Sequence, residues 1–237
     1  MKLETIGDIN PFSRFDPDLA ERLNKLAESP LVSETNSEGR KNNSGVVSLD
    51  KIVFEPSKLN ELQYFNNSLS GLKGRGWKRH ARPVEVMTVL FDYLTKGDSS
   101  KYAVLAKSML SGKGEWISAA FKKTSNFLEF ALDPENLVWN NNAYVINGSS
   151  LVSSEIKRFD IGNKSSGSWI DLGEFPDDLV AYLYGLKFKD LPKEMQEGSK
   201  RAQLLFREDW WPVGRGYVSN YYLSAYCSSW ASRGVRP

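Results

Sequence analysis

The segment from Arg82 to Asp98 constrains the fold most strongly, because its apolar residues lie on more than one side of a helix. Pro83 suits a first helical turn and Gly97 suits a C-terminal cap, so the sequence predicts a helix between them. Two apolar stripes run along this helix, formed by Val84, Met87, Phe91 and Leu94 and by Val86, Leu90 and Tyr93. A helix that is apolar on several sides is buried between other elements. The chain is therefore expected to build a core around this helix.

The composition allows such a core and excludes several classes of protein. The chain has 237 residues, of which 41% are hydrophobic, and its formal net charge of +2 excludes a histone-like polycation. No run approaches the roughly 18 apolar residues of a membrane span, and the first residues lack the apolar core of a signal peptide. We therefore expect an intracellular, cytoplasmic protein without a membrane span.

The chain contains one cysteine, Cys227, and one histidine, His80. This excludes a disulfide scaffold and a thiolate metal cluster, and it leaves little histidine-based chemistry. A metal-dependent nuclease site is a weak alternative, because divalent metals need clustered oxygens. Its candidate residues are Glu155 and Lys157 with Asp171, Glu174, Asp177 or Asp178. We expect a protein that is not an enzyme and that uses no cofactor or metal.

The middle of the chain predicts further elements after the first helix. Residues 99–110 and 115–132 read as two more helices, the second of them sharply two-sided. Residues 137–146 read as a β-hairpin, because two β-prone runs flank an asparagine triplet that tolerates positive φ. Three helices followed by a hairpin resemble the order of elements in a winged-helix domain. The predicted fold class is α+β.

We divide the chain into four parts by composition. Residues 1–32 form an N-terminal helical arm in which Asp16 can cap a helix, and residues 33–45 form a flexible linker without aliphatic or aromatic side chains. Residues 46–150 form the helical, winged-helix-like domain, which opens with a strand at 46–56. Residues 151–237 form a mixed α/β, aromatic-rich C-terminal lobe, with helices predicted at 175–188, capped by Asp177, and at 193–209.

The basic segment, residues 71–82, is the clearest charge feature. It holds no acid and surrounds Trp77 with five cations, which are Lys73, Arg75, Lys78, Arg79 and Arg82. Cations bind phosphates, glycines let backbone amides approach them, and an indole can stack on a base. The opposing interpretation is a solvated basic loop with Trp77 tucked into the core. Lys122 and Lys123, on the two-sided helix, are the predicted secondary contacts.

The C-terminal tail, from residue 210 onward, is rich in aromatic residues and has no acid. Its predicted interface residues are Trp210, Trp211, Tyr217, Tyr221 and Tyr222. Tyrosine and tryptophan are favoured anchors of protein interfaces, and they also form stacking platforms for single-stranded nucleic acid or sugar rings. Packing of the tail against the core is an equally good interpretation, and Cys227 fits a small buried residue.

Two functional hypotheses follow from these features. The first is non-catalytic binding of nucleic acid, DNA or RNA, through the basic segment. The second is a structural or assembly protein, such as a viral coat, matrix or nucleocapsid-type subunit, that forms a homo-oligomer through its aromatic tail.

Overall fold

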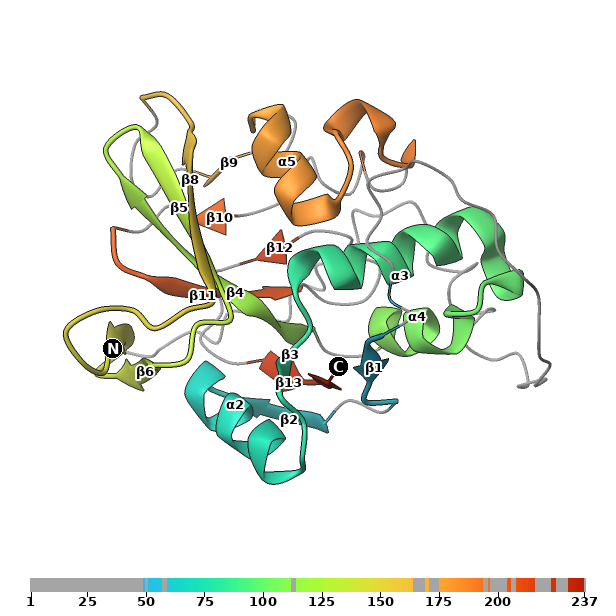
Figure 1. Ribbon diagram of the computed structural model, residues 1–237, viewed down its shortest axis with the longest axis horizontal. Helices are drawn as coiled ribbons and strands as arrows, with labels where there is room; N and C mark the ends of the chain where they lie inside the picture. The colour runs from blue at the N-terminus through green and yellow to red at the C-terminus, as the bar shows by residue number, and fades with distance from the viewer. Residues whose placement is uncertain are drawn as a thin grey trace, which may run out of the picture. The chain divides into compact units, whose positions relative to one another are not determined.

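The computed structural model describes residues 49, 51–56, 59–111, 114–163, 169–170, 175–193, 196, 204–205, 208–215, 223–224 and 230–236. All of these residues fall within the unit formed by Arg40–Pro237. The predicted helical arm at 1–32 and linker at 33–45 lie outside them. Helices and sheets occur together, which confirms the α+β class (Figure 1). No helix among these residues is long and apolar enough to cross a membrane.

A seven-stranded sheet is organised around β4 (Glu115–Thr124). One edge of β4 pairs with β11, and the other edge is divided between two strands. At Glu115 this second edge pairs with β13 in parallel, whereas residues 119–124 pair with β5 in antiparallel. The remaining strands extend outward from these three. Their bounds are β2 Leu59–Gln63, β5 Phe127–Leu132, β8 Glu155–Asp160, β11 Trp211–Arg215, β12 Leu223–Ser224 and β13 Trp230–Ser232.

The predicted helix after Arg82 is confirmed as α3 (Pro83–Lys96), with Gly97 as its C-cap at φ 57°. The stripe of Val86, Leu90 and Tyr93 is buried. In the other stripe Met87 is buried, and Val84, Phe91 and Leu94 are partly buried. Helix α3 packs against α5 and α4, and Figure 1 shows it beside the central strands, with α5 above it and α4 below it in the view. The other helical bounds are α2 Phe65–Gly74, α4 Ala103–Leu110, α5 Asp177–Tyr184, η1 Gly97–Ser99 and η3 Phe188–Asp190.

The prediction of a third helix over residues 115–132 is wrong. These residues form β4 and β5, joined by a two-residue turn at Ser125 and Asn126, with Ser125 at φ 50°. The cause is burial, because every residue from Glu115 to Phe121 is buried and the strand has no alternation to reveal it. The third of the three predicted helices is therefore replaced by two strands, and the winged-helix-like order of elements stays a prediction.

The predicted hairpin over residues 137–146 is confirmed. Strands β6 (Leu137–Asn140) and β7 (Ala143–Ile146) pair in antiparallel, and Asn141 and Asn142 occupy the turn at φ 46° and 66°. Positive φ at both central residues is the type I′ geometry that asparagine tolerates.

The predicted helices of the C-terminal lobe differ in outcome. The one at 175–188 is α5, but its N-cap is Pro176, and Asp177 stands in its first turn. Most of residues 193–209 lie outside the described part, although Leu204–Leu205 form strand β10, paired with β9 (Trp169–Ile170). The strand predicted at 46–56 is β1 (Val53–Phe54).

C-terminal strands join segments that are far apart in sequence. Strand β14 (Gly234–Arg236) lies between β1 and β3 (Arg79–His80) in a three-stranded sheet. Strands from residues 46–150 and from residues 151–237 thus share the same sheets.

The core is densely aromatic and leaves no space beside Trp230. Its ring packs edge-on against Trp116, which in turn contacts Phe65 and Tyr144. A Cβ atom at Gly114 would lie 2.1 Å from the Trp230 ring, and one at Gly214 would lie 2.7 Å from it. Both positions require glycine because the indole lies directly against the backbone.

A buried carboxylate connects the strands at this point. Glu115 accepts a hydrogen bond from Arg215 at 3.2 Å and another from Arg233 at 2.8 Å, and all three side chains are almost fully buried. Arg215 also donates to the carbonyl of Met109. Arg215 and Arg233 of the tail are therefore part of the core.

Candidate nucleic-acid interface

The backbone of the basic segment closes helix α2 and does not form an anion-binding nest. The amide of Gly76, at φ 80°, donates to the carbonyl of Lys73 at 3.1 Å, and that of Trp77 donates to Leu72 at 3.0 Å. These two bonds make a Schellman motif, which requires the left-handed conformation of Gly76. The amide of Lys78 donates to Val235 of β14. The glycines thus serve the fold, and these amides have internal acceptors.

Arg79 is held between two acidic side chains. Its guanidinium forms a bidentate pair with the buried carboxylate of Glu85, at 2.6 and 2.8 Å. Its Nε lies 3.5 Å from Asp133. Glu85 also accepts from the backbone amide of Arg82, at the start of α3. Arg79 therefore neutralises a carboxylate that would otherwise be buried without a partner.

Arg82 pairs with Asp133 across the start of the sheet. Its Nε donates to both oxygens of Asp133, at 3.1 and 3.3 Å, and Ser154 donates to the same carboxylate at 2.7 Å. Burial acts to raise the pKa of Asp133, but the hydrogen bonds from Arg82 and Ser154 outweigh it and hold the pKa below its ordinary value. Asp133 is therefore a carboxylate that bridges Arg79 and Arg82.

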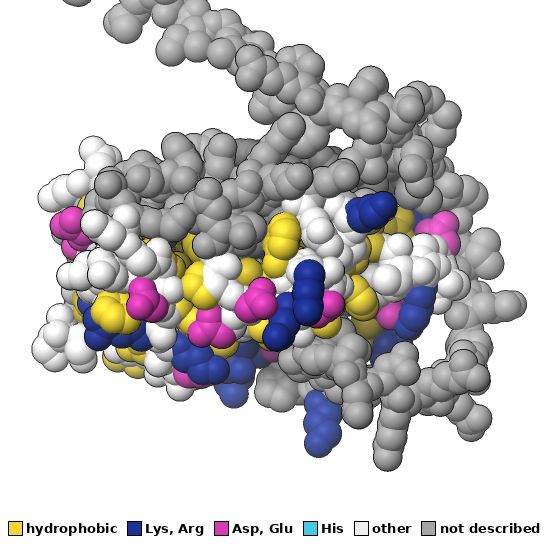
Figure 2. Space-filling model, turned by 90° about the horizontal axis from the view of Figure 1, so that it is seen from above, with side chains coloured by type: hydrophobic (Ala, Val, Ile, Leu, Met, Phe, Trp, Pro, Cys, Tyr) yellow, Lys and Arg dark blue, Asp and Glu magenta, His cyan; other side chains and the backbone are white. Residues whose placement is uncertain are grey.

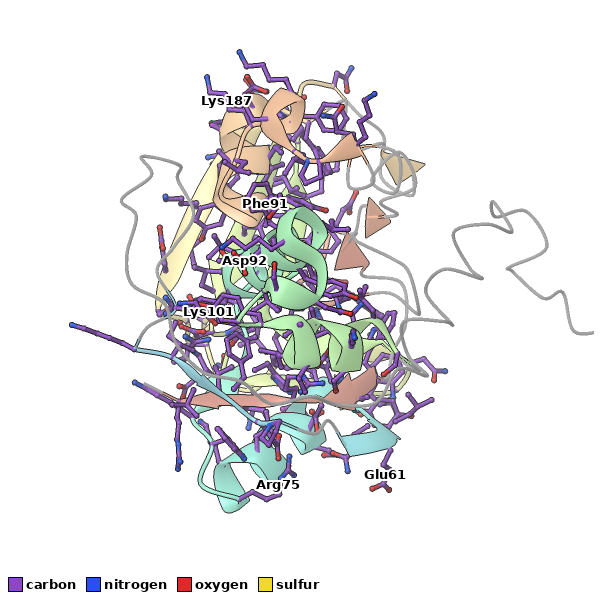
Figure 3. The ribbon with its side chains drawn as sticks, turned by 90° about the vertical axis from the view of Figure 1, so that its right-hand side faces the viewer. Glu61, Arg75, Phe91, Asp92, Lys101 and Lys187 are labelled. Atoms are coloured by element: carbon purple, nitrogen blue, oxygen red, sulfur yellow. The ribbon has the colours of Figure 1, made fainter. Side chains whose placement is uncertain are left out.

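Arg75 and Lys73 have weaker partners. Arg75 donates to both oxygens of Glu55, at 3.2 and 3.3 Å, from the end of α2 (Figure 3). Lys73 lies 3.5 Å from Glu135, and both side chains are about half exposed. Of the five predicted phosphate-binding cations, Lys78 alone forms no ion pair with a described residue.

Lys78 has a neighbour that the prediction of the site left out. In the register of β3 and β14, Gly234 lies opposite His80 and Val235 opposite Arg79. Lys78 precedes β3, and its amide donates to the carbonyl of Val235, the residue before Arg236. The side chains of Lys78 and Arg236 are exposed, and neither forms an ion pair with a residue that the structure describes. The guanidinium of Arg236 lies 5.0 Å from the centre of the Trp77 ring. We call Trp77, Lys78 and Arg236 the Trp77 surface.

Trp77 is half-buried, so it is neither the fully exposed stacking ring nor the core residue that the two interpretations of the sequence predicted. Its ring lies against the backbone of β14, since a Cβ atom at Gly234 would come within 2.3 Å of it. The ring is therefore held in one orientation while part of it stays accessible.

Lys122 and Lys123 lie on strand β4 and not on the helix that the sequence predicted for them. Lys122 pairs with Glu129 at 3.2 Å and lies 5.2 Å from the centre of the Trp210 ring. Lys123 is buried and donates to the carbonyl of Ser125. The structure does not bring these lysines together with the basic segment as one site.

The aromatic tail enters the core where it is described. Trp210 and Trp211 are 7% and 4% exposed, so little of either ring remains for an interface. Tyr217, Tyr221, Tyr222 and Cys227 lie outside the described residues.

His80 is fully buried, and its Nε2 shares a hydrogen bond of 2.8 Å with Ser68. Burial, assisted by the positive charges of Arg75 and Arg79, lowers the pKa of His80 to about 3. The ring packs against Phe65. A neutral imidazole that water cannot reach is a structural group and is unsuited to proton transfer with a substrate.

Acidic residues do not gather into a metal site in the described part of the chain. Of the weak nuclease candidates, Glu155 pairs with Lys157 on β8, and Asp177 and Asp178 begin α5. Asp171 and Glu174 fall outside the described residues. Among the described side chains on the face shown in Figure 2, cations and carboxylates are interspersed.

Comparison of the chain with protein-family models, with curated proteins and with solved structures finds no match in any of the three. Its function is therefore argued from its own residues.

Replacing Arg79 by methionine is expected to lower the free energy of unfolding by about 3 kcal/mol, because it leaves Glu85 buried and unpaired. Replacing the adjacent Lys78 by methionine should change it by no more than about 0.5 kcal/mol. Urea unfolding of both variants measures the difference. Equal effects would contradict a structural role for Arg79.

Stability is expected to fall in acid because of His80. Its folded pKa, about 3, lies below the ordinary value of 6.5, so the neutral form stabilises the fold. That contribution is complete above pH 6.5 and is lost as the pH falls towards 3. Between these values the loss should approach about 1.4 kcal/mol for each pH unit.

The His80→Gln variant lacks this titration, and Ser68→Ala keeps it. Urea unfolding over a series of pH values should therefore show that the free energy of unfolding falls less steeply in acid for His80→Gln than for the natural protein and Ser68→Ala. Three parallel curves would show that His80 is not the titrating group.

Proposed function

We propose that this protein binds nucleic acid without catalysing a reaction, and that the Trp77 surface makes the central contact. The observation that carries the proposal is that two exposed cations adjoin the Trp77 ring. Lys78 follows Trp77 in the chain, and the guanidinium of Arg236 lies 5.0 Å from the ring centre. Elsewhere in the basic segment the cations have carboxylate partners. Lys78 and Arg236 are exposed, and neither forms an ion pair with a residue that the structure describes.

Lys78 and Arg236 extend from adjacent segments, joined by the hydrogen bond from the Lys78 amide to Val235, and like charges close together repel each other. A phosphate between Lys78 and Arg236 would remove that repulsion and form charge-assisted hydrogen bonds with both. Val53, which lies opposite Arg236 on β1, is 48% exposed and adds an apolar rim. The pair thus favours an anionic ligand over a neutral one.

The Trp77 ring adds a contact that a free phosphate does not use. It is fixed against Gly234 and carries a cation at 5.0 Å, an arrangement in which a base can stack beside a bound phosphate. Such stacking contributes about 1–3 kcal/mol per base and tolerates any sequence. A polymer of nucleotides therefore fits this surface better than inorganic phosphate.

The other predicted residues act differently in this proposal. Lys73 stands at the rim, because its exposed pair with Glu135 contributes little and can exchange for a phosphate. Arg75, Arg79 and Arg82 hold the segment in place through Glu55, Glu85 and Asp133.

Self-association is the second candidate, with a coat, matrix or nucleocapsid-type subunit as the class. One observation favours it at a surface other than the tail. Strand β2 pairs with β13 and with no other described strand, and Leu62 and Tyr64 near its end are 41% and 37% exposed. An unpaired edge with apolar side chains can pair with another copy.

Fluorescence anisotropy of labelled single- and double-stranded oligonucleotides, at low and physiological salt, tests the proposal. We expect salt-sensitive binding by the natural protein. The double variant Lys78→Gln, Arg236→Gln should weaken it and reduce the slope of log K against log salt by about 2. Trp77→Leu should weaken binding with little change in that slope.

The matched control is Lys187→Gln with Lys189→Gln, which removes the same charge from exposed positions. Figure 3 shows Lys187 at the opposite end of the view from Arg75. Equal losses in both double variants would contradict a specific Trp77 surface. Absence of binding at low salt would refute the proposal, and a large mass by light scattering would favour self-association.

A further inference from the structure

The loop after β7 holds the single Asn-Gly pair of the chain, Asn147–Gly148. Both residues are exposed. Glycine has no side chain to hinder its backbone nitrogen, and Gly148 has φ 131°, a conformation that other residues rarely adopt. The chemistry of this pair therefore depends on what the fold does with the nitrogen of Gly148.

Asn136 closes this loop and leaves that nitrogen unbound. Its carbonyl accepts from the amide of Asn147 at 2.8 Å, and its side-chain amide donates to the carbonyls of Asn147 and Ser150 at 3.1 and 2.9 Å. Its Oδ1 accepts from the amide of Val152. The nitrogen of Gly148 forms no hydrogen bond with any residue that the structure describes. The loop is thus fixed at both sides of an amide that is open to solvent.

We propose that Asn147 is a site of spontaneous deamidation in the folded protein. The backbone nitrogen of Gly148 loses its proton and attacks Cγ of Asn147. The Cγ–Nδ2 bond breaks, the side-chain nitrogen leaves as ammonia, and a cyclic imide forms between the two residues. Water then opens the ring at either carbonyl to give aspartate or isoaspartate. The two reaction steps together consume one water, release one ammonia and involve no oxidation.

The modification changes the loop in two ways. Each product adds a carboxylate at an exposed position, and the isoaspartyl product also inserts a methylene into the main chain. The inserted methylene lies between Asn147 and Ser150, the two residues whose carbonyls accept hydrogen bonds from the side chain of Asn136. The inference is independent of nucleic-acid binding, because it uses neither the basic segment nor the Trp77 surface.

Asn126 provides an internal reference within the same chain. It is exposed and lies in the turn between β4 and β5, but the residue after it is Phe127, whose side chain crowds the attacking nitrogen. The purified full chain is incubated at mildly alkaline pH, folded in one arm and in concentrated urea in another. Peptide mass spectrometry and labelling by an isoaspartyl methyltransferase follow both asparagines over time.

In the folded protein Asn147 should convert at least about tenfold faster than Asn126, equivalent to roughly 1.4 kcal/mol of activation free energy. The rate should rise with pH, and the Asn147→Gln variant should lose the product in that peptide. Conversion at Asn147 that appears in urea but not in the folded chain would overturn the proposal, because the loop would then protect the pair. Equal rates at the two asparagines would also overturn it.

Discussion

The buried carboxylate of Glu115 is the interaction on which the rest of the structure depends. It lies between Arg215 of β11 and Arg233, which immediately precedes β14, at the end of β4 where three strands meet. Removing charged groups from water is costly, and removing one partner of such a group leaves an uncompensated buried charge. Arg233 also donates to the carbonyls of Glu55 and Pro56 and to Ser108. The guanidinium of Arg233 thus connects the C-terminal strand to the residues after β1, to α4 and to β4.

This buried interaction continues to the surface through Glu55. Arg233 donates a hydrogen bond to the backbone carbonyl of Glu55. The carboxylate of Glu55 accepts hydrogen bonds from the amide of Gly234 and from the side chain of Arg75. The neighbouring cations of the basic segment are fixed in the same way by Glu85 and Asp133. Much of the positive charge that suggests a phosphate site is therefore used in folding. The proposed ligand site is the smaller Trp77 surface, in which Lys78 and Arg236 come from two distant segments and the ring is set against the backbone.

Local patterns were predictable from the sequence, and long-range pairings were not. Helix α3 and the 137–146 hairpin are specified by residues within each element, by Pro83 and Gly97 in one case and by Asn141 and Asn142 in the other. Strand β4 was mistaken for a helix because burial of both faces removes its alternation. Arg82 and Asp133 are 51 residues apart, so no local pattern relates them. Trp77 and Lys78 could be identified from composition, whereas Arg236 joins them only through the pairing of β3 and β14.

The free energies of unfolding of the natural protein, Glu115→Gln, Arg233→Met and the double variant measure the central interaction most directly. If Glu115 and Arg233 depend on each other as described, the double variant should lose less stability than the sum of the single losses, by about 2 kcal/mol. Losses that add to within about 0.5 kcal/mol would show that the two side chains act independently and would contradict this account.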